Sequence, residues 1–128
     1  MRRVTIVATG VLIVLAMASG AQASTQVVDR KSGRGDYAVA TAGGNVRHPK
    51  RLWVKVTSRP HERVYVSWTD TCGKGFGAGS KSGHFRATTA VKRRIKMPYH
   101  RPDSCSVAAT GQLQNKGRKI TVTILARV

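Results

Sequence analysis

The chain has 128 residues, with 23 Lys and Arg against 5 Asp and Glu, and its formal net charge at pH 7 is +18. Its length leaves room for one small domain. Charges of one sign repel each other in a compact fold and attract polyanions, so the composition favours a partner such as a cell-wall polymer, an acidic glycan or an anionic membrane surface.

The N-terminal segment has the order of a secretory signal. Arg2 and Arg3 form a short positive start, residues 6–18 are uncharged and mostly apolar, and Ala21-Gln22-Ala23 is a signal-peptidase pattern. The apolar run is shorter than the roughly 20 residues of a spanning helix, so an uncleaved anchor is the weaker alternative. We expect residues 1–23 to be removed between Ala23 and Ser24 and the protein to be secreted. Export argues against intracellular nucleic acid as the physiological partner.

Cys72 and Cys105 are the only two cysteines of the chain. In an exported protein, one disulfide is the simplest expectation, and a free or intermolecular thiol is the alternative. In the chain-entropy model, a disulfide that closes a loop of this length stabilises the fold by about 3–4 kcal/mol.

The mature chain divides into two parts. Residues 24–36 are polar and charged, which predicts a flexible N-terminal arm. From residue 37 to 128 apolar and polar residues alternate, as in half-buried strands. The inward sets that this period predicts are Leu52, Val54 and Val56; Val64, Val66 and Trp68; Cys105, Val107 and Ala109; and Ile120, Val122, Ile124 and Ala126.

Glycine-containing stretches predict the turns. Residues 37–41 read as a short first strand, followed by a turn at Ala42-Gly43-Gly44-Asn45, and Asn115-Lys116-Gly117 reads as a hairpin loop. Six to seven strands in this arrangement predict an all-β, antiparallel sandwich, with an immunoglobulin-like fold favoured and a small barrel as the alternative. The Cys-Trp-Cys spacing of antibody domains is absent, and we expect Trp68 to lie near the disulfide.

Residues 73–83 are rich in glycine and predict a flexible connection between the two sheets. A phosphate-binding loop would end in Gly-Lys-Ser/Thr, whereas this stretch ends in Ser80-Lys81-Ser82. An alternative is an anion-binding nest in which Lys74 and Lys81 join free backbone N–H groups.

Four basic residues share one parity in the next run, which predicts a cationic stripe on one sheet face. These hypothetical anion-binding residues are Arg86, Lys92, Arg94 and Lys96. Neighbouring side chains in such a stripe lie about 6.5–7 Å apart, which suits a repeating polyanion, and His100, Arg101 and Lys119 could extend it. The alternative is a solvated face that only keeps the protein soluble.

Catalysis has little support in the sequence. Glu62 is the sole Glu, and together with His84 or His100 it could supply the acid and base of a small extracellular ribonuclease, but no spacing selects these residues. The four histidines lack paired metal-ligand spacing, so no metal and no cofactor is expected.

Several stretches resemble small exported β-domain proteins from high-GC Gram-positive bacteria. They are Val66-Ser67-Trp68, Cys72-Gly73-Lys74-Gly75, residues 79–83, Pro102-Asp103-Ser104-Cys105 and Ile120-Thr121-Val122-Thr123. The resemblance covers about the last two-thirds of the chain and implies an exported, disulfide-linked β domain, with no activity or site attached.

The sequence therefore favours a secreted, basic, non-enzymatic β domain that binds anionic extracellular or cell-wall material. Two alternatives are a cationic effector or antimicrobial protein, and a proteinaceous inhibitor that presents the 73–83 loop. An effector would be expected to carry an amphipathic cationic helix, and the chain shows none after the signal. An inhibitor would need a rigid loop, against which the glycine content argues.

Overall fold

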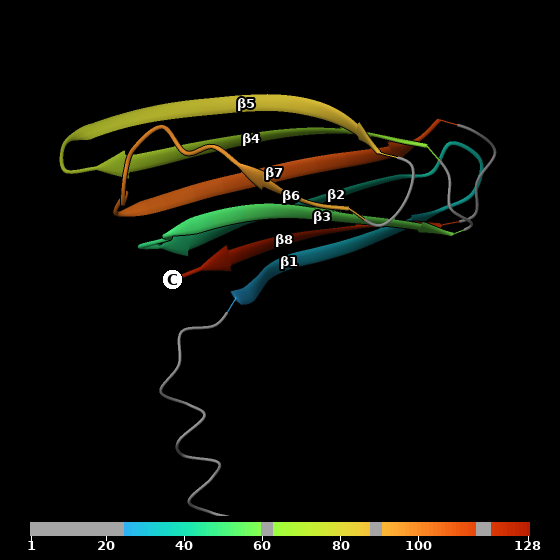
Figure 1. Ribbon diagram of the computed structural model, residues 1–128, viewed down its shortest axis with the longest axis horizontal. Coiled ribbons are helices and arrows are strands. Elements are labelled where there is room, and N and C mark those ends of the chain that lie inside the picture. The colour runs from blue at the N-terminus through green and yellow to red at the C-terminus, as the bar shows by residue number, and fades with distance from the viewer. Residues whose placement is uncertain (1–24, 60–62, 88–90, 115–118) are drawn as a thin grey trace, which may run out of the picture.

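The computed structural model describes residues 25–59, 63–87, 91–114 and 119–128. In these residues eight strands form two four-stranded antiparallel sheets, stacked on each other (Figure 1). The β1 sheet has the order β1 (Thr25–Arg34), β8 (Lys119–Arg127), β3 (Arg51–Arg59) and β6 (Val91–Ile95). The β2 sheet has the order β2 (Val39–Arg47), β7 (Ser104–Leu113), β4 (Val64–Lys74) and β5 (Gly77–Ala87). The predicted all-β antiparallel sandwich is confirmed.

The strand order is that of a jelly roll, not of an immunoglobulin domain. Successive strands alternate between the two sheets, except that β4 and β5 form a hairpin within one sheet. A jelly roll consists of eight strands in two such sheets, whereas an immunoglobulin domain sorts its strands as ABED and CFG. The prediction of an immunoglobulin-like fold with six to seven strands was wrong, because alternation identifies strands without saying which sheet each one joins.

The eighth strand comes from the predicted N-terminal arm. β1 pairs with β8 from Thr25 opposite Arg127 to Arg34 opposite Lys119, so a flexible arm over residues 24–36 is wrong for this segment. β1 is an edge strand that bears a bulge between Val27 and Asp29, and most of its side chains are exposed. Because an edge strand can leave most of its side chains in solvent, it needs few apolar residues. Its sequence therefore looks like that of a flexible arm.

The predicted turn at Ala42-Gly43-Gly44-Asn45 is also wrong, because these residues lie inside β2 and pair with β7. A Cβ atom on Gly44 would lie 2.9 Å from the Cγ1 atom of Val28 in β1. The glycine therefore lets an edge strand of one sheet approach an edge strand of the other.

The core lies between the sheets and contains the predicted inward residues. Leu52, Val54 and Val56 of β3 and Ile120, Val122 and Ile124 of β8 are fully buried and face Val64, Val66 and Val107 of the other sheet. Burying such side chains stabilises the fold by about 1.5–3 kcal/mol each.

The disulfide between Cys72 and Cys105 is confirmed. The two residues lie opposite each other on β4 and β7, so the disulfide joins adjacent strands of the β2 sheet. Trp68 lies on the same face of β4 as Cys72, half-buried against the core. A Cβ atom on Gly83 of β5 would lie 2.7 Å from the Trp68 ring, so this glycine makes room for the indole.

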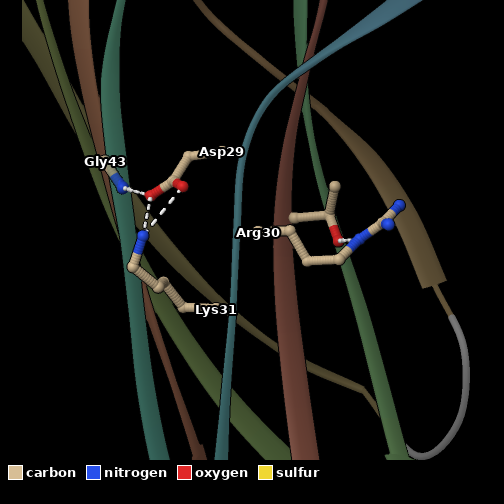
Figure 2. A network of polar contacts seen from close by, with 5 residues as sticks. Asp29, Arg30, Lys31 and Gly43 are labelled. Atoms are coloured by element: carbon tan, nitrogen blue, oxygen red, sulfur yellow. Dashed lines mark hydrogen bonds and ion pairs between the residues drawn. The ribbon is translucent and has the colours of Figure 1, made fainter.

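The two open edges of the sandwich are closed by different contacts. On the edge between β1 and β2, the Gly43 amide N donates to Asp29 Oδ2 at 2.8 Å and Lys31 Nζ lies 3.0 Å from Asp29 Oδ1 (Figure 2). The Gly43 hydrogen bond, aided by Lys31, lowers the pKa of Asp29. On the other edge, the Arg93 guanidinium of β6 lies 4.5 Å from the centre of the Phe85 ring of β5. Both contacts join one sheet to the other.

Several predictions fall outside the described residues. They concern the signal segment with its cleavage site between Ala23 and Ser24, the catalytic candidate Glu62 and the loop Asn115-Lys116-Gly117. The strands on either side of that loop, β7 and β8, lie in different sheets, so they do not form the predicted hairpin. In the described part of the chain, no helix has the length and apolar character needed to cross a membrane.

Candidate anion-binding groove

The glycine-rich stretch is a hairpin, not a flexible connection between sheets. β4 and β5 pair from Val64 opposite Ala87 to Lys74 opposite Gly77, and the turn contains Gly75 with a φ of 59°. A Cβ atom on Gly77 would lie 3.1 Å from the Tyr99 hydroxyl oxygen. The glycine lets the connection between β6 and β7 pack against β5.

That connection, residues 96–103, passes from the β1 sheet to the β2 sheet at the end of the sandwich where the β4–β5 turn and the C-terminus lie (Figure 1). Asp103 fixes it to the hairpin, because its amide N donates to the Gly73 carbonyl O and its Oδ2 accepts from the Gly75 amide N, each at 2.8 Å. Lys74 Nζ donates to the His100 carbonyl O at 2.8 Å. The connection therefore has a defined conformation.

A groove of about 980 Å³ lies beside this connection. Seven cationic side chains line it: Lys50, Arg51, Lys81, Arg94, Lys96, Arg101 and Arg127. His100 also lines it, and none of the described acidic residues does. Because the cations come from β3, β5, β6, β8 and the connections at this end, the jelly-roll topology concentrates positive charge at one site.

The groove also has an apolar part. Ile95, Met97, Pro98 and Tyr99 line it together with the cations. Ile95 is buried, and the other three are half-buried, with Met97 and Tyr99 packed against the core. We call these four residues the apolar floor. The groove thus offers an anionic ligand both charge and a surface that water solvates poorly.

The predicted cationic stripe is divided by the fold. Lys92 and Arg94 lie on β6 of the β1 sheet, and Arg94 and Lys96 line the groove. Arg86 lies on β5 of the β2 sheet, 6.0 Å from the centre of the Tyr65 ring, so the prediction that all four share a face was wrong. The chain changes sheet between β5 and β6, and alternation within one run does not reveal that change. Of the proposed nest residues, Lys81 lines the groove, and Lys74 binds a carbonyl.

Arg94 connects the groove to the outer face of the β1 sheet. On that face Lys92 Nζ lies 4.7 Å from the centre of the Trp53 ring, Arg94 is opposite Trp53, and Lys92 is opposite Lys55. We call this surface the cationic face. Among residues whose side chains are described, its basic residues are Arg30, Arg34, Arg51, Lys55, Lys92, Arg94, Lys119 and Arg127, which alternation and register place on one side of the sheet.

Sequence reasoning missed Lys50, Arg51 and Arg127 as groove residues. Arg51 begins β3 and Arg127 ends β8, and the two are opposite each other in the sheet. Lys50 precedes β3, and its amide N donates to the Arg127 carbonyl O. Their positions at strand ends were visible in the sequence, but only the pairing of β3 with both β8 and β6 brings them to Arg94.

Asp70 is buried next to a groove residue. It is 0% exposed on the inner side of β4, directly opposite Lys81 of β5, and neither of its oxygens accepts a hydrogen bond of ordinary geometry from a described residue. Burial raises the pKa of Asp70 to about 6, while the Lys81 backbone and ammonium oppose this shift. The fold therefore holds one carboxyl that resists ionisation.

The two histidines of the ribonuclease hypothesis lie on different elements. The His84 ring on β5 stacks on Tyr65 with centroids 5.8 Å apart, whereas His100 belongs to the 96–103 connection. Among the described residues, no group of three or more His, Cys, Asp or Glu side chains could hold a metal ion.

No family model matches the sequence, and no curated protein matches it either. Among solved structures, the fold is similar to a carbohydrate-binding module, TmCBM61, in complex with beta-1,4-galactotriose, with a TM-score of 0.48 and 12% identity over 83% of this chain and 70% of that one. A second similar structure, of carbohydrate-binding modules from the β-sandwich superfamily, has a TM-score of 0.41 and 10% identity over 82% of this chain and 52% of that one. A third, CBM32 of AlyQ in complex with 4,5-unsaturated mannuronic acid, has a TM-score of 0.32 and 15% identity over 74% of this chain and 75% of that one. Likeness of this degree does not assign a ligand or a family.

Proposed function

We propose that this protein is a secreted, non-enzymatic module that binds an anionic polymer through the groove and the cationic face. The observation that carries the proposal is the groove lining, in which seven Lys and Arg side chains gather without an acidic residue of the described chain. The partner is a cell-wall polymer, an acidic glycan or an anionic membrane surface. Lys and Arg hold such anions directly, so no cofactor is required.

The arrangement of the cations supports an extended ligand. From the groove, Arg94 leads to Lys92 two residues earlier on the same strand, at a spacing of about 6.5–7 Å. Lys55 continues the row on the neighbouring strand. A single small anion would contact only a few of these side chains, whereas a repeating polyanion can contact them in series.

The hydrogen bonds around Asp103 also support tight binding. They hold the groove wall in one conformation, so less conformational entropy is lost when a ligand binds. The disulfide supports an extracellular location, since such bonds persist in oxidising compartments.

The test compares two double charge reversals with the same net charge. Arg94→Glu with Lys96→Glu alters the groove, and Arg63→Glu with Arg86→Glu alters exposed cations on or next to the β2 sheet that belong neither to the groove nor to the cationic face. Affinity for isolated cell wall, an acidic glycan and anionic vesicles is measured at about 0.15 M salt. The groove variant should lose at least about tenfold in affinity, roughly 1.4 kcal/mol, while the control stays near the parent protein. Equal losses in both variants would mean that only the total charge matters.

A second candidate function is favoured by the hairpin tip. Phe76 is fully exposed at the β4–β5 turn, and the hydrogen bonds from Gly75 and Lys74 hold that turn in place. The rigidity that an inhibitor needs is thus present in this hairpin. An inhibitor function predicts a stable complex with an extracellular hydrolase that Phe76→Ala abolishes, with polyanion binding unchanged. Equal hydrolase binding by parent and variant would rule this candidate out.

A further inference from the structure

We infer that the polymer is a chain of carboxylated pyranose sugars, whose rings lie on the apolar floor while the surrounding cations hold the carboxylates. This inference rests on the proposed function and narrows its ligand to one chemical class. It is based on the joint presence of apolar and cationic side chains in one groove.

The apolar floor favours a ligand that has an apolar surface in addition to negative charge. Met97, Pro98 and Tyr99 keep part of their surface accessible, although Met97 and Tyr99 pack against the core. Covering apolar surface contributes about 25 cal/mol for each Å² removed from water. A pyranose ring has a face of C–H groups that can cover such a floor. An inorganic polyphosphate chain has no apolar face and would leave the floor in contact with water.

The position of the floor is fixed by packing. The Tyr99 hydroxyl oxygen lies 3.1 Å from where a Cβ of Gly77 would be, and Pro98 Cβ lies 3.3 Å from where a Cβ of Gly79 would be. A Cβ atom at either glycine would require Tyr99 or Pro98 to move by a few tenths of an ångström. The glycine-rich strand β5 therefore serves to seat the floor against the sheet.

The cations around the floor suit carboxylates carried at regular intervals. Lys81 reaches the groove from β5, Arg94 and Lys96 from the end of β6, and Arg51 and Arg127 from paired strand ends. Arg in particular binds carboxylates through two parallel hydrogen bonds. A linear chain can place its carboxylates at these cations in succession while its rings cover the apolar floor.

Salt weakens the contacts of the cations with a ligand more than it weakens contact with the apolar floor. Contacts between exposed charges weaken as the Debye length falls from about 8 Å near 0.15 M to about 3 Å at 1 M salt. Apolar contact is not screened in this way. A carboxylated sugar chain should therefore keep more of its affinity at high salt than a polyphosphate with the same number of negative charges.

The experiment uses the mature chain and two probes of equal charge number, a galacturonate oligomer and an inorganic polyphosphate. Affinity for each is measured by calorimetry between about 0.15 M and 1 M salt. The galacturonate oligomer should bind at least tenfold more tightly at the highest salt. Tyr99→Ala should weaken galacturonate binding about tenfold and leave polyphosphate binding within twofold. Pro98→Ser provides a second floor variant should Tyr99→Ala fail to fold.

The outcomes separate this inference from the proposed function. If neither probe binds at the lower salt concentration and anionic vesicles do not bind either, the proposed function fails. Should polyphosphate bind as well as galacturonate at every salt concentration, or both floor variants weaken the two probes equally, the groove binds anions but the sugar assignment is wrong. Tighter binding to anionic vesicles than to galacturonate would overturn the assignment in favour of a membrane surface.

Discussion

The two outer faces of the sandwich differ in charge although the same alternation generates both. The cationic face on the β1 sheet carries eight of the described Lys and Arg residues along its four strands. The outer face of the β2 sheet carries Arg47 and Arg86 but is formed mainly by hydroxyl and amide side chains. Among them are Thr41, Asn45, Ser67, Thr69, Thr71, Ser80, Ser82, Ser104, Ser106, Thr110 and Gln112. We call this surface the hydroxyl face.

Contacts within each face follow its composition. On the hydroxyl face, neighbouring strands exchange hydrogen bonds between Thr41 and Thr110 at 3.0 Å and between Thr71 and Ser80 at 2.9 Å. On the cationic face, Lys92 lies over Trp53. On the same face, the Arg30 Nε donates to the Thr123 Oγ1 at 3.3 Å, and Figure 2 shows the Arg30 side chain. The protein therefore concentrates its charge on one sheet instead of spreading it evenly. A solubility role alone would not require this concentration.

The largest expected effect concerns the sheet beneath the hydroxyl face, which the disulfide links through β4 and β7. Cys72→Ser with Cys105→Ser should lower the free energy of unfolding by about 3–4 kcal/mol, because the unfolded chain gains conformational freedom. Denaturant unfolding measures this loss, and hydrogen exchange should show faster opening of β4 and β7 than of β3 and β8. Unchanged stability would mean that the cross-link contributes nothing to the folded state.

Asp70, on the inner side of the same sheet, should make stability depend on pH. A pKa raised from 3.8 to about 6 means that the folded protein binds this proton more tightly than the unfolded chain does. Asp70 therefore favours the folded state most when it is protonated, and its contribution falls as the pH rises from about 4 to about 6 and is constant above. The pKa shift corresponds to a loss of about 3 kcal/mol in the free energy of unfolding between pH 4 and pH values well above 6.

Asp70→Asn removes this ionisation and tests the pH effect. The variant should be more stable than the parent protein at pH 8, and the difference should vanish near pH 4. Thermal unfolding across this pH range provides the measurement. A parent protein whose stability relative to the variant stays constant with pH would show that Asp70 ionises without cost.

The functional difference between the faces can be tested with two double variants that each lower the net charge by two. Lys92→Gln with Arg94→Gln removes cations from the cationic face, and Ser67→Glu with Ser106→Glu adds anions to the hydroxyl face. The first should weaken binding of an acidic glycan about 30-fold, because each of the two cations near an anionic surface contributes about 1 kcal/mol. The second should change it less than threefold. Equal effects in a binding titration would show that the two faces are not functionally distinct.

The smallest expected effects come from single surface contacts. Lys92→Met removes the cation–π contact with Trp53, which should cost about 0.5–1 kcal/mol of stability. Thr41→Val removes the hydroxyl contact with Thr110 and should cost a similar or smaller amount. Chemical denaturation of the two variants compares these costs. A loss above about 2 kcal/mol in either would mean that its face carries stability in addition to any binding role.

The sequence determined the period of the strands, and with it much of the core. Leu52, Val54 and Val56 alternate with polar residues, and because side chains on a strand point alternately to its two sides, all three had to lie on one face. The cysteine count similarly predicted the pair Cys72 and Cys105, since no other partner exists. The alternation is a local property of each strand, and the disulfide pair follows from the presence of only two cysteines.

The tertiary structure decided which sheet each strand joins. Arg86 and Lys92 are six positions apart in one basic run, yet they lie on strands of different sheets. The groove likewise depends on Arg51 and Arg127, which meet through a pairing between distant strands. Strand pairing is set by how the whole set of inward faces packs together, and that arrangement is not encoded in any single stretch of alternation.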